Sequence, residues 1–257
     1  MSTLNFKSFV RYVAGDSTPC SPLAKVGFLG GVLGAALISL PALAQVNQAT
    51  ITAILGRDQE VFIQDQTAQE NDSANLGEEV RTEAARAQLS FNTGAAGRMT
   101  ENSSVLVGQC IEVEQGTVIA SGPANGCIAG FAVGVQGTIY VMRADAGGIG
   151  SIFVLEGQVR LASQDNPNDP NALVINAGQK IPRLTRGLAL QNLVIEQLSQ
   201  GEYEQIITGP LFQGYPQPLA GQEKIQQICD RLYGKSCVAV GSKLPQIEDG
   251  TPVRGLW

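Results

Sequence analysis

The chain has 257 residues, 44% of them hydrophobic, which is enough for one or two folded domains with a buried core. It carries 17 basic and 23 acidic residues, and an acidic protein of this kind lacks the positive surface that binding to nucleic acid needs. Because the sequence contains no histidine, catalysis by Ser-His-Asp or Cys-His groups is excluded.

The first 44 residues have the composition of a secretory signal peptide. Three basic residues precede an apolar run over residues 26–40, and Pro41 and the small-x-small segment Ala42-Leu43-Ala44 follow it. A positive start, an apolar middle and a small-residue end predict cleavage between Ala44 and Gln45. The alternative is an uncleaved membrane anchor, since the 19 residues 26–44 are just long enough to span a bilayer. We therefore expect a periplasmic or extracellular protein or, in the alternative, one anchored in the membrane and facing the periplasm.

Four of the five cysteines remain after such a cleavage, together with 14 basic and 22 acidic residues and a net charge of −8. An even number of cysteines in an exported chain predicts disulfides. Of the three possible pairings we favour the local one, Cys110 with Cys127 and Cys229 with Cys237. The first bond would then bracket a hairpin over residues 113–126. A metal site is the alternative, and the lack of histidine and of Cys-x-x-Cys spacing disfavours it.

Beyond residue 48 the chain shows short segments in which apolar and polar residues alternate, with turn residues between them. Turns at about every eight to twelve positions predict an all-β architecture, here of about ten to twelve strands. The expected strands cover residues 49–55, 60–64, 77–82, 87–91, 105–108, 111–121, 131–135, 137–142, 151–155, 158–161 and 173–178.

Two segments that begin 41 residues apart have similar sequences. Residues 111–121 and residues 152–163 each predict a strand, a glycine turn and a second strand, with Gly116 and Gly157 at the turns. A repeated unit of this size is typical of stacked modules that bury their apolar faces against one another. We therefore predict a mainly β fold, a short twisted β-solenoid or β-roll of stacked hairpins, with a β-sandwich as the alternative.

Residues 186–257 differ in character and form a C-terminal extension with short helices. Apolar residues at partial helical spacing occur over residues 193–207, and a Pro/Gly-rich connector follows at residues 208–219. Residues 223–233 predict a short amphipathic helix that ends before Gly234. We expect the extension to cap an open edge of the β domain.

Within residues 49–185, short motifs occur in an order that resembles the FecR domain family. They are a Gly-x-x-Val-x-Thr segment, a Gly-Thr pair, a Glu-Gly-x-Val segment and a final glycine. The residues concerned are Gly77, Val80, Thr82, Gly137, Thr138, Glu156, Gly157, Val159 and Gly178. The resemblance implies a periplasmic, solenoid-like β domain in which these residues are structural. We expect no counterpart of the cytoplasmic anti-sigma region of the iron-dicitrate regulator, because only 25 residues precede the apolar segment.

The resemblance implies sensing or binding at the cell envelope rather than catalysis. We expect a non-enzymatic binding or signalling module without cofactor or metal, whose partner is a protein or an envelope polymer. Nucleic acid is not expected as a partner, and the membrane only if the N-terminal segment stays attached. Recognition through an exposed strand edge is the favoured mechanism. The alternatives are a self-associating structural or surface component and, less favoured, a carbohydrate-active enzyme with paired carboxylates such as Glu112 and Glu114.

Overall fold

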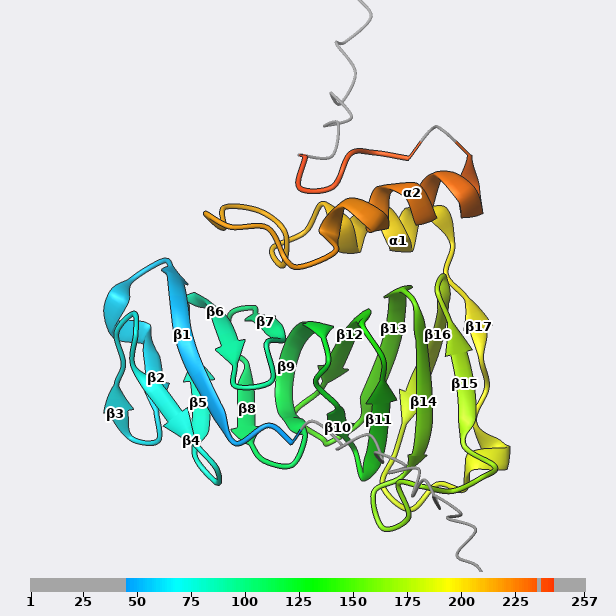
Figure 1. The fold of residues 1–257 in the computed structure, drawn as a ribbon, viewed down its shortest axis with the longest axis horizontal. Coiled ribbons are helices and arrows are strands. Elements are labelled where there is room, and N and C mark those ends of the chain that lie inside the picture. The colour runs from blue at the N-terminus through cyan, green and yellow to red at the C-terminus, as the bar shows by residue number, and fades with distance from the viewer. Residues whose placement is uncertain (1–44, 235–236, 243–257) are drawn as a thin grey trace, which may run out of the picture. The chain divides into compact units, whose positions relative to one another are not determined.

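A computed structural model describes residues 45–234 and 237–242 of the chain (Figure 1). The expected signal segment, including Ala44, lies outside the described residues, and Gln45 is the first residue described. Within the described part the chain forms 17 strands and two α-helices, which confirms the prediction of a mainly β fold. Neither helix in this part of the chain is long and apolar enough to cross a membrane.

The strands are short and follow one another closely along the chain. The first nine are β1 (Gln48–Leu55), β2 (Val61–Ile63), β3 (Gln66–Thr67), β4 (Ser73–Asn75), β5 (Glu79–Thr82), β6 (Arg86–Phe91), β7 (Ala96–Met99), β8 (Ser104–Val107) and β9 (Ile111–Gly122). The others are β10 (Gly126–Ile128), β11 (Phe131–Val135), β12 (Thr138–Ala144), β13 (Gly150–Glu156), β14 (Gln158–Ser163), β15 (Leu173–Asn176), β16 (Gln179–Leu184) and β17 (Glu196–Gln197). The helices are α1 (Gln200–Ile207) and α2 (Gln222–Tyr233), and two 3-10 turns lie at Asp58–Glu60 and Leu190–Asn192.

The strands form two sheets that share strand β9. The first sheet has the order β4-β1-β6-β7-β9-β12-β13-β16-β17. The second has the order β3-β2-β5-β8-β9-β10-β11-β14-β15. Among the described strands every pairing is antiparallel except that of β9 with β10, so the arrangement is mixed and open. In both sheets the strands are arranged from N-terminal ones at one end to C-terminal ones at the other, from blue to yellow in Figure 1.

Gly116 and Gly157 are points at which the chain crosses from one sheet to the other. Both have a positive φ, +85° and +79°. The part of β9 before Gly116 pairs with β8 and the part after it with β12, while β13 and β14 on either side of Gly157 pair with different neighbours. The expectation that each repeated segment is a hairpin is therefore wrong. Alternating strands around a glycine have the same sequence pattern whether the chain folds back or moves to another sheet.

The disulfide between Cys110 and Cys127 joins the two ends of one passage of the chain from the second sheet through the first sheet and back. Strand β10 returns to the second sheet beside the start of β9 and runs parallel to it. Both expected bonds, this one and Cys229–Cys237, are present. Residues 113–126 are not a hairpin, however, because the chain passes through the first sheet between the two cysteines.

The main core lies between the two sheets and takes side chains from both. Its fully buried members include Val80, Val105, Val133, Leu89, Val118, Tyr140 and Val154. Alternation along β12 reveals a second buried face of the first sheet. Tyr140 and Met142 enter the main core, whereas Ile139 and Val141 belong to a separate apolar cluster on the other side.

The C-terminal segment covers this outer face of the first sheet. Tyr203 and Ile207 of α1, and Ile225 and Cys229 of α2, are buried in the same cluster as Val141. Figure 1 shows the two helices lying together along one side of the strands. The predicted helix corresponds to α2. The extension covers the edge of β16 through β17, as expected, but its two helices pack on a face of the sheet, which was not expected. The physical reason is that the apolar outward side chains of β12 and β13 need cover.

The crossing at Gly116 predicts that replacing this glycine costs more stability than replacing Gly77, although the two have nearly the same φ. A Cβ on Gly116 would lie within 2.5 Å of Ser103 Cα, whereas a Cβ on Gly77, at φ +86°, would meet nothing within 4 Å. We expect Gly77→Ala to cost about 1–2 kcal/mol for the positive φ alone. Gly116→Ala should cost about 1–3 kcal/mol more, because the crossing must also be forced apart. Urea unfolding of both variants measures the difference, and equal losses would contradict the close packing at the crossing.

Candidate binding groove

A hollow of about 560 Å³ lies between the outer face of the first sheet and helix α1, open to solvent. Its floor comes from β9, β12 and β13, and its walls come from the turn between β7 and β8, from α1 and from the start of the connector after α1. The lining residues are Thr100, Glu101, Asn102, Thr117, Val141, Arg143, Phe153, Glu202, Gln205, Ile206, Pro210 and Leu211. We call this hollow the groove.

An arginine above an aromatic ring dominates the floor of the groove. Arg143 lies opposite Thr117 across β12 and β9, and its Nε donates a hydrogen bond to Thr117 Oγ1 at 3.3 Å. Its guanidinium lies 5.3 Å from the centre of the Phe153 ring. Among the described residues no carboxylate forms an ion pair with this arginine. An exposed guanidinium beside an aromatic ring has further N–H donors beyond the one bonded to Thr117. It is suited to binding an anionic group that lies next to an apolar one.

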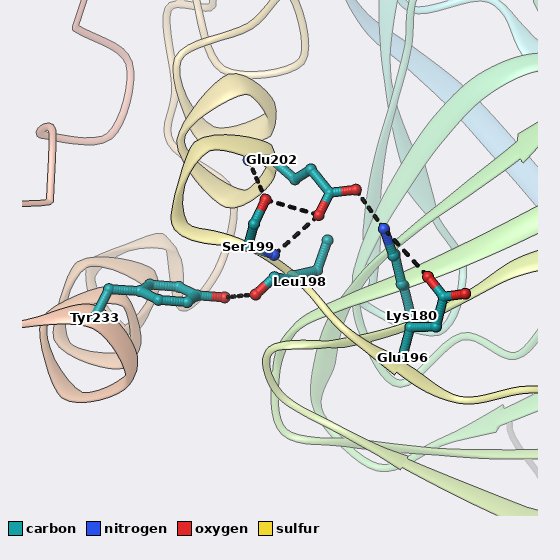
Figure 2. A network of polar contacts seen from close by, with 6 residues as sticks. All are labelled: Lys180, Glu196, Leu198, Ser199, Glu202 and Tyr233. Carbon is teal, nitrogen blue, oxygen red and sulfur yellow. Dashed lines mark hydrogen bonds and ion pairs between the residues drawn. The ribbon is translucent and has the colours of Figure 1, made fainter.

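The α1 wall of the groove is held to the sheet by a polar network around Glu202 (Figure 2). Ser199 Oγ accepts a hydrogen bond from Glu202 N, and Glu202 Oε2 accepts one from Ser199 N at 2.9 Å, so the helix begins with a capping box. Glu202 Oε1 forms an ion pair with Lys180 of β16, whose Nζ also lies 3.6 Å from Glu196 Oε2. The Tyr233 hydroxyl donates to the Leu198 carbonyl at 2.6 Å, which ties α2 to the same start of α1.

This network shifts the protonation of its charged members in opposite directions. The hydrogen bond from Lys180, together with those from Ser199, lowers the pKa of Glu202 to about 2. The hydrogen bond to Glu202 raises the pKa of Lys180. Both groups therefore remain charged across the neutral range, and Glu202 serves as an anchor for the wall rather than as an acid.

The other wall depends on a buried arginine of β7. Arg98, of which 1% is exposed, donates to Gln88 Oε1 at 3.0 Å, to the Leu211 carbonyl at 2.9 Å and to the Gln217 carbonyl. Its guanidinium also lies 4.1 Å from the centre of the Tyr215 ring. Burial lowers the pKa of Arg98 to about 10, so the charge is retained at neutral pH. These contacts bind the Pro/Gly-rich connector to the sheet and bring its first residues to the edge of the groove.

One cross-strand row joins the two walls. On the outer face of the first sheet, neighbouring partners run in the order Gln88, Arg98, Ile119, Val141, Phe153, Lys180 and Glu196. The apolar centre of the row lies under the helices and the groove, and its two cations bind the connector and α1. The same backbone register therefore positions the floor and both walls.

The family-motif residues lie away from the groove and act in the fold. Thr82 Oγ1 accepts from Ser103 N at 3.0 Å and donates to the Thr100 carbonyl at 2.7 Å, at the corner that packs on Gly116. Thr138 lies against Gly157 as Ser103 lies against Gly116, and it donates to the Gln158 carbonyl at 2.8 Å.

The other motif residues also have structural places. Glycines of the motif have positive φ at positions 77, 137, 157 and 178, and the two valines are fully buried in the core. Glu156 lies 3.9 Å from Lys224 of α2, at the longest range of an ion pair. The residues concerned here are Gly77, Gly137, Gly157, Gly178, Val80, Val159 and Glu156.

Of the paired carboxylates considered in the sequence, Glu114 has a local partner, as do Glu78 and Glu79. Glu78 Oε2 accepts from Asn75 N at 2.7 Å, and Ser104 Oγ lies between Glu79 and Glu114. No cluster of His, Cys, Asp or Glu side chains that could hold a metal ion occurs in the described part of the chain. These contacts brace turns and strand faces.

Exposed strand edges offer little to a partner strand. The edge strand β17 has two residues and carries Glu196, and β15 has four. The Asn176 N–H at the edge of β15 is already bonded to Gln179 Oε1 at 2.8 Å, and the Asn75 N–H at the opposite end is bonded to Glu78 in the same way. Short, charged and partly blocked edges are typical of edges that avoid strand addition. The groove is therefore the better candidate site than the edges that the sequence favoured.

The residues that build the groove were missed in the sequence, although one signal was available. The runs at residues 138–142 and 151–155 contain too few polar positions for strands with one solvated face, and such runs are typical of strands buried on both sides. That pattern would have placed Phe153 under a covering layer. Nothing local in the sequence connects Arg98 to the connector more than a hundred residues later.

Comparisons with known proteins add little to this geometry. No protein-family model matches the chain, and no curated protein sequence does either. Among solved structures, a crystal structure of a candidate anti-sigma factor from Parabacteroides distasonis is similar at a TM-score of 0.40 and 10% identity. The match covers 51% of this chain and 65% of that protein, so the chain spans just under two thirds of its length. At this level of similarity the match carries no argument about function.

The lowered pKa of Glu202 predicts a pH dependence of stability. Because its pKa falls from 4.5 to about 2 on folding, the ion pair stabilises the protein above pH 4.5 and is lost as the pH falls towards 2. Glu202→Gln keeps the capping box but removes the charge, so at pH 7 it should lower the free energy of unfolding by about 1 kcal/mol or less for this partly exposed pair. The difference from the unmodified protein should vanish near pH 2. Urea unfolding across pH measures it, with the exposed Glu223→Gln as control, and a gap independent of pH would contradict the assignment.

Proposed function

We propose that the protein is an exported member of the FecR domain family that acts as a non-enzymatic binding or signalling module in the periplasm or cell envelope. Three features support the proposal: the ordered motifs at structural corners, the winding of the chain between two sheets, and the two disulfides. Such winding is expected of a short β-solenoid. Disulfides are typical of oxidising compartments outside the cytoplasm.

The groove is the proposed binding surface, and the observation that carries this is Arg143 above Phe153 in an open hollow. The apolar floor favours a hydrophobic side chain, and the guanidinium favours a carboxylate close to it. A protein segment with an apolar residue next to an acidic one satisfies both. The absence of an enzymatic role is part of the proposal: the one groove carboxylate with a shifted pKa, Glu202, is held charged by Lys180 and cannot supply a proton near neutral pH.

Self-association is a second candidate, favoured by where apolar side chains are exposed. In the described part of the chain the large exposed ones lie in or beside edge strands at the two ends of the sheets, or next to Gly178. They are Leu76, Val174, Val194 and Leu232. An end-to-end contact between copies would cover them. Sedimentation at increasing concentration distinguishes the candidates, since a species that stays monomeric contradicts assembly.

Export is tested by the intact mass of the protein from its native host, measured without reductant. We expect a soluble chain that begins at Gln45 and is lighter than its fully reduced form by four hydrogens, because both disulfides are closed. A full-length chain in the membrane fraction would contradict cleavage and favour the membrane-anchored alternative.

Binding at the groove is tested with a library of random displayed peptides selected on the full chain. We expect enriched peptides to combine an apolar residue with an adjacent acidic one and to lose at least tenfold in affinity on Arg143→Glu, a loss equivalent to about 1.4 kcal/mol. Arg160→Glu is the matched control, since Arg160 is also an exposed arginine and lies on β14 of the other sheet. Equal binding by both variants would contradict the groove as the site.

A further inference from the structure

A second charged side chain lines the groove, and its sign is opposite to that of Arg143. Glu101, in the turn between β7 and β8, is exposed and belongs to the same wall as Thr100 and Asn102. Among the described residues no basic group forms an ion pair with Glu101. Within the described part of the chain, the groove therefore presents one cation and one anion that have no ionic partner.

The backbone on both sides of Glu101 is bonded to neighbouring strands and turns. Thr100 N donates to the Thr117 carbonyl at 3.0 Å, and Asn102 N donates to the Glu83 carbonyl at 2.8 Å. Asn102 has a φ of +53°, a conformation that asparagine adopts more readily than most residues and that turns the chain at this point. The Glu101 side chain thus starts from a defined position, while the residue itself is exposed to solvent.

The register of the first sheet sets the separation between the two charges. Thr100 is bonded to Thr117 of β9, and Thr117 lies opposite Arg143 of β12. Because neighbouring strands lie about 4.8 Å apart, the backbones of Thr100 and Arg143 are roughly 10 Å apart, and Glu101 follows Thr100 directly. Arg143 is bonded to Thr117 and lies beside the Phe153 ring instead of pairing with Glu101. The groove therefore has a positive pole and a negative pole on the two sides of β9.

We propose that the groove selects a partner segment that carries charges of both signs. Its acidic residue lies against Arg143, the adjacent apolar residue against Phe153, and a basic residue against Glu101. Charge complementarity at both poles favours this partner over a purely acidic segment, which would bring a like charge to Glu101. An extended chain advances about 3.3 Å per residue, so the separation and the reach of a Lys or Arg side chain place the basic residue about two to four positions from the acidic one. This inference rests on the groove being the binding site of the proposed function, and it makes Glu101 a determinant of specificity.

The test uses the full chain and the peptides that it enriches from the random displayed library. We expect these peptides to carry a Lys or Arg at that spacing from the acidic residue. Glu101→Lys should weaken their binding by about fivefold or more, because an attraction becomes a repulsion. Replacing the basic residue of the peptide by Glu should restore most of the affinity for the Glu101→Lys variant. Fluorescence anisotropy measures each Kd, and urea unfolding checks that the exposed substitution leaves the fold intact.

Glu114→Lys is the matched control for the change in net charge. Glu114 is an exposed glutamate of β9 that does not line the groove, so its replacement should change the affinity by less than about twofold.

The outcomes separate this inference from the proposed function. Peptides that need Arg143 but carry no basic residue, or that bind the Glu101→Lys and Glu114→Lys variants equally, would overturn the inference and leave the groove as a peptide site. Peptides that bind the Arg143→Glu variant as tightly as the unmodified chain would contradict the groove itself, and both proposals with it. The same conclusion follows if the full chain enriches no peptide.

Discussion

The central constraint of this structure is that the central strands of its first sheet, β12 and β13 above all, are buried on both faces. Strands β12 and β13 send Tyr140 and Val154 into the core between the sheets, and Val141 and Phe153 to the opposite side. Burial of such side chains stabilises each by roughly 1.5–3 kcal/mol, so the outer face cannot be left in water at little cost. The C-terminal helices and the connector therefore contribute to the stability of the β domain. The groove lies where they leave the outer face of the first sheet uncovered.

Charged and polar groups determine how that cover is placed. Apolar burial has no direction, so Ile139 and Val141 alone would accept a helix in many positions. Arg98 near one end of the cross-strand row binds the connector through the Leu211 and Gln217 carbonyls, and Lys180 near the other end binds the start of α1. With both ends fixed, the gap over Arg143 and Phe153 has a defined shape, which a binding site requires.

The sequence predicted the mainly β class, eleven of the 17 described strands, the cysteine pairing and helix α2, because each depends on local periodicity or spacing. It missed the strands β3, β4, β7, β10, β16 and β17. It failed at Gly116 and Gly157, where hairpin and crossing have identical local patterns and only the distant pairing partners differ. It also failed at the groove. Arg143 and Phe153 come from neighbouring strands, but their opposing wall comes from a helix about fifty residues later, and no short-range signal connects them. The family-motif residues lie at turns, crossings and core positions, so they gave no indication of the groove.

Amide hydrogen exchange on the full chain tests the two-sided burial most directly. If the helical layer is an integral part of the domain, amides of α1 and α2 should exchange only in the same cooperative opening as those of β12 and β13. Fast exchange throughout α1 and α2, with β12 and β13 still fully protected, would mean that the layer opens independently. The groove would then lack a stable wall, and the account of the site given above would be contradicted.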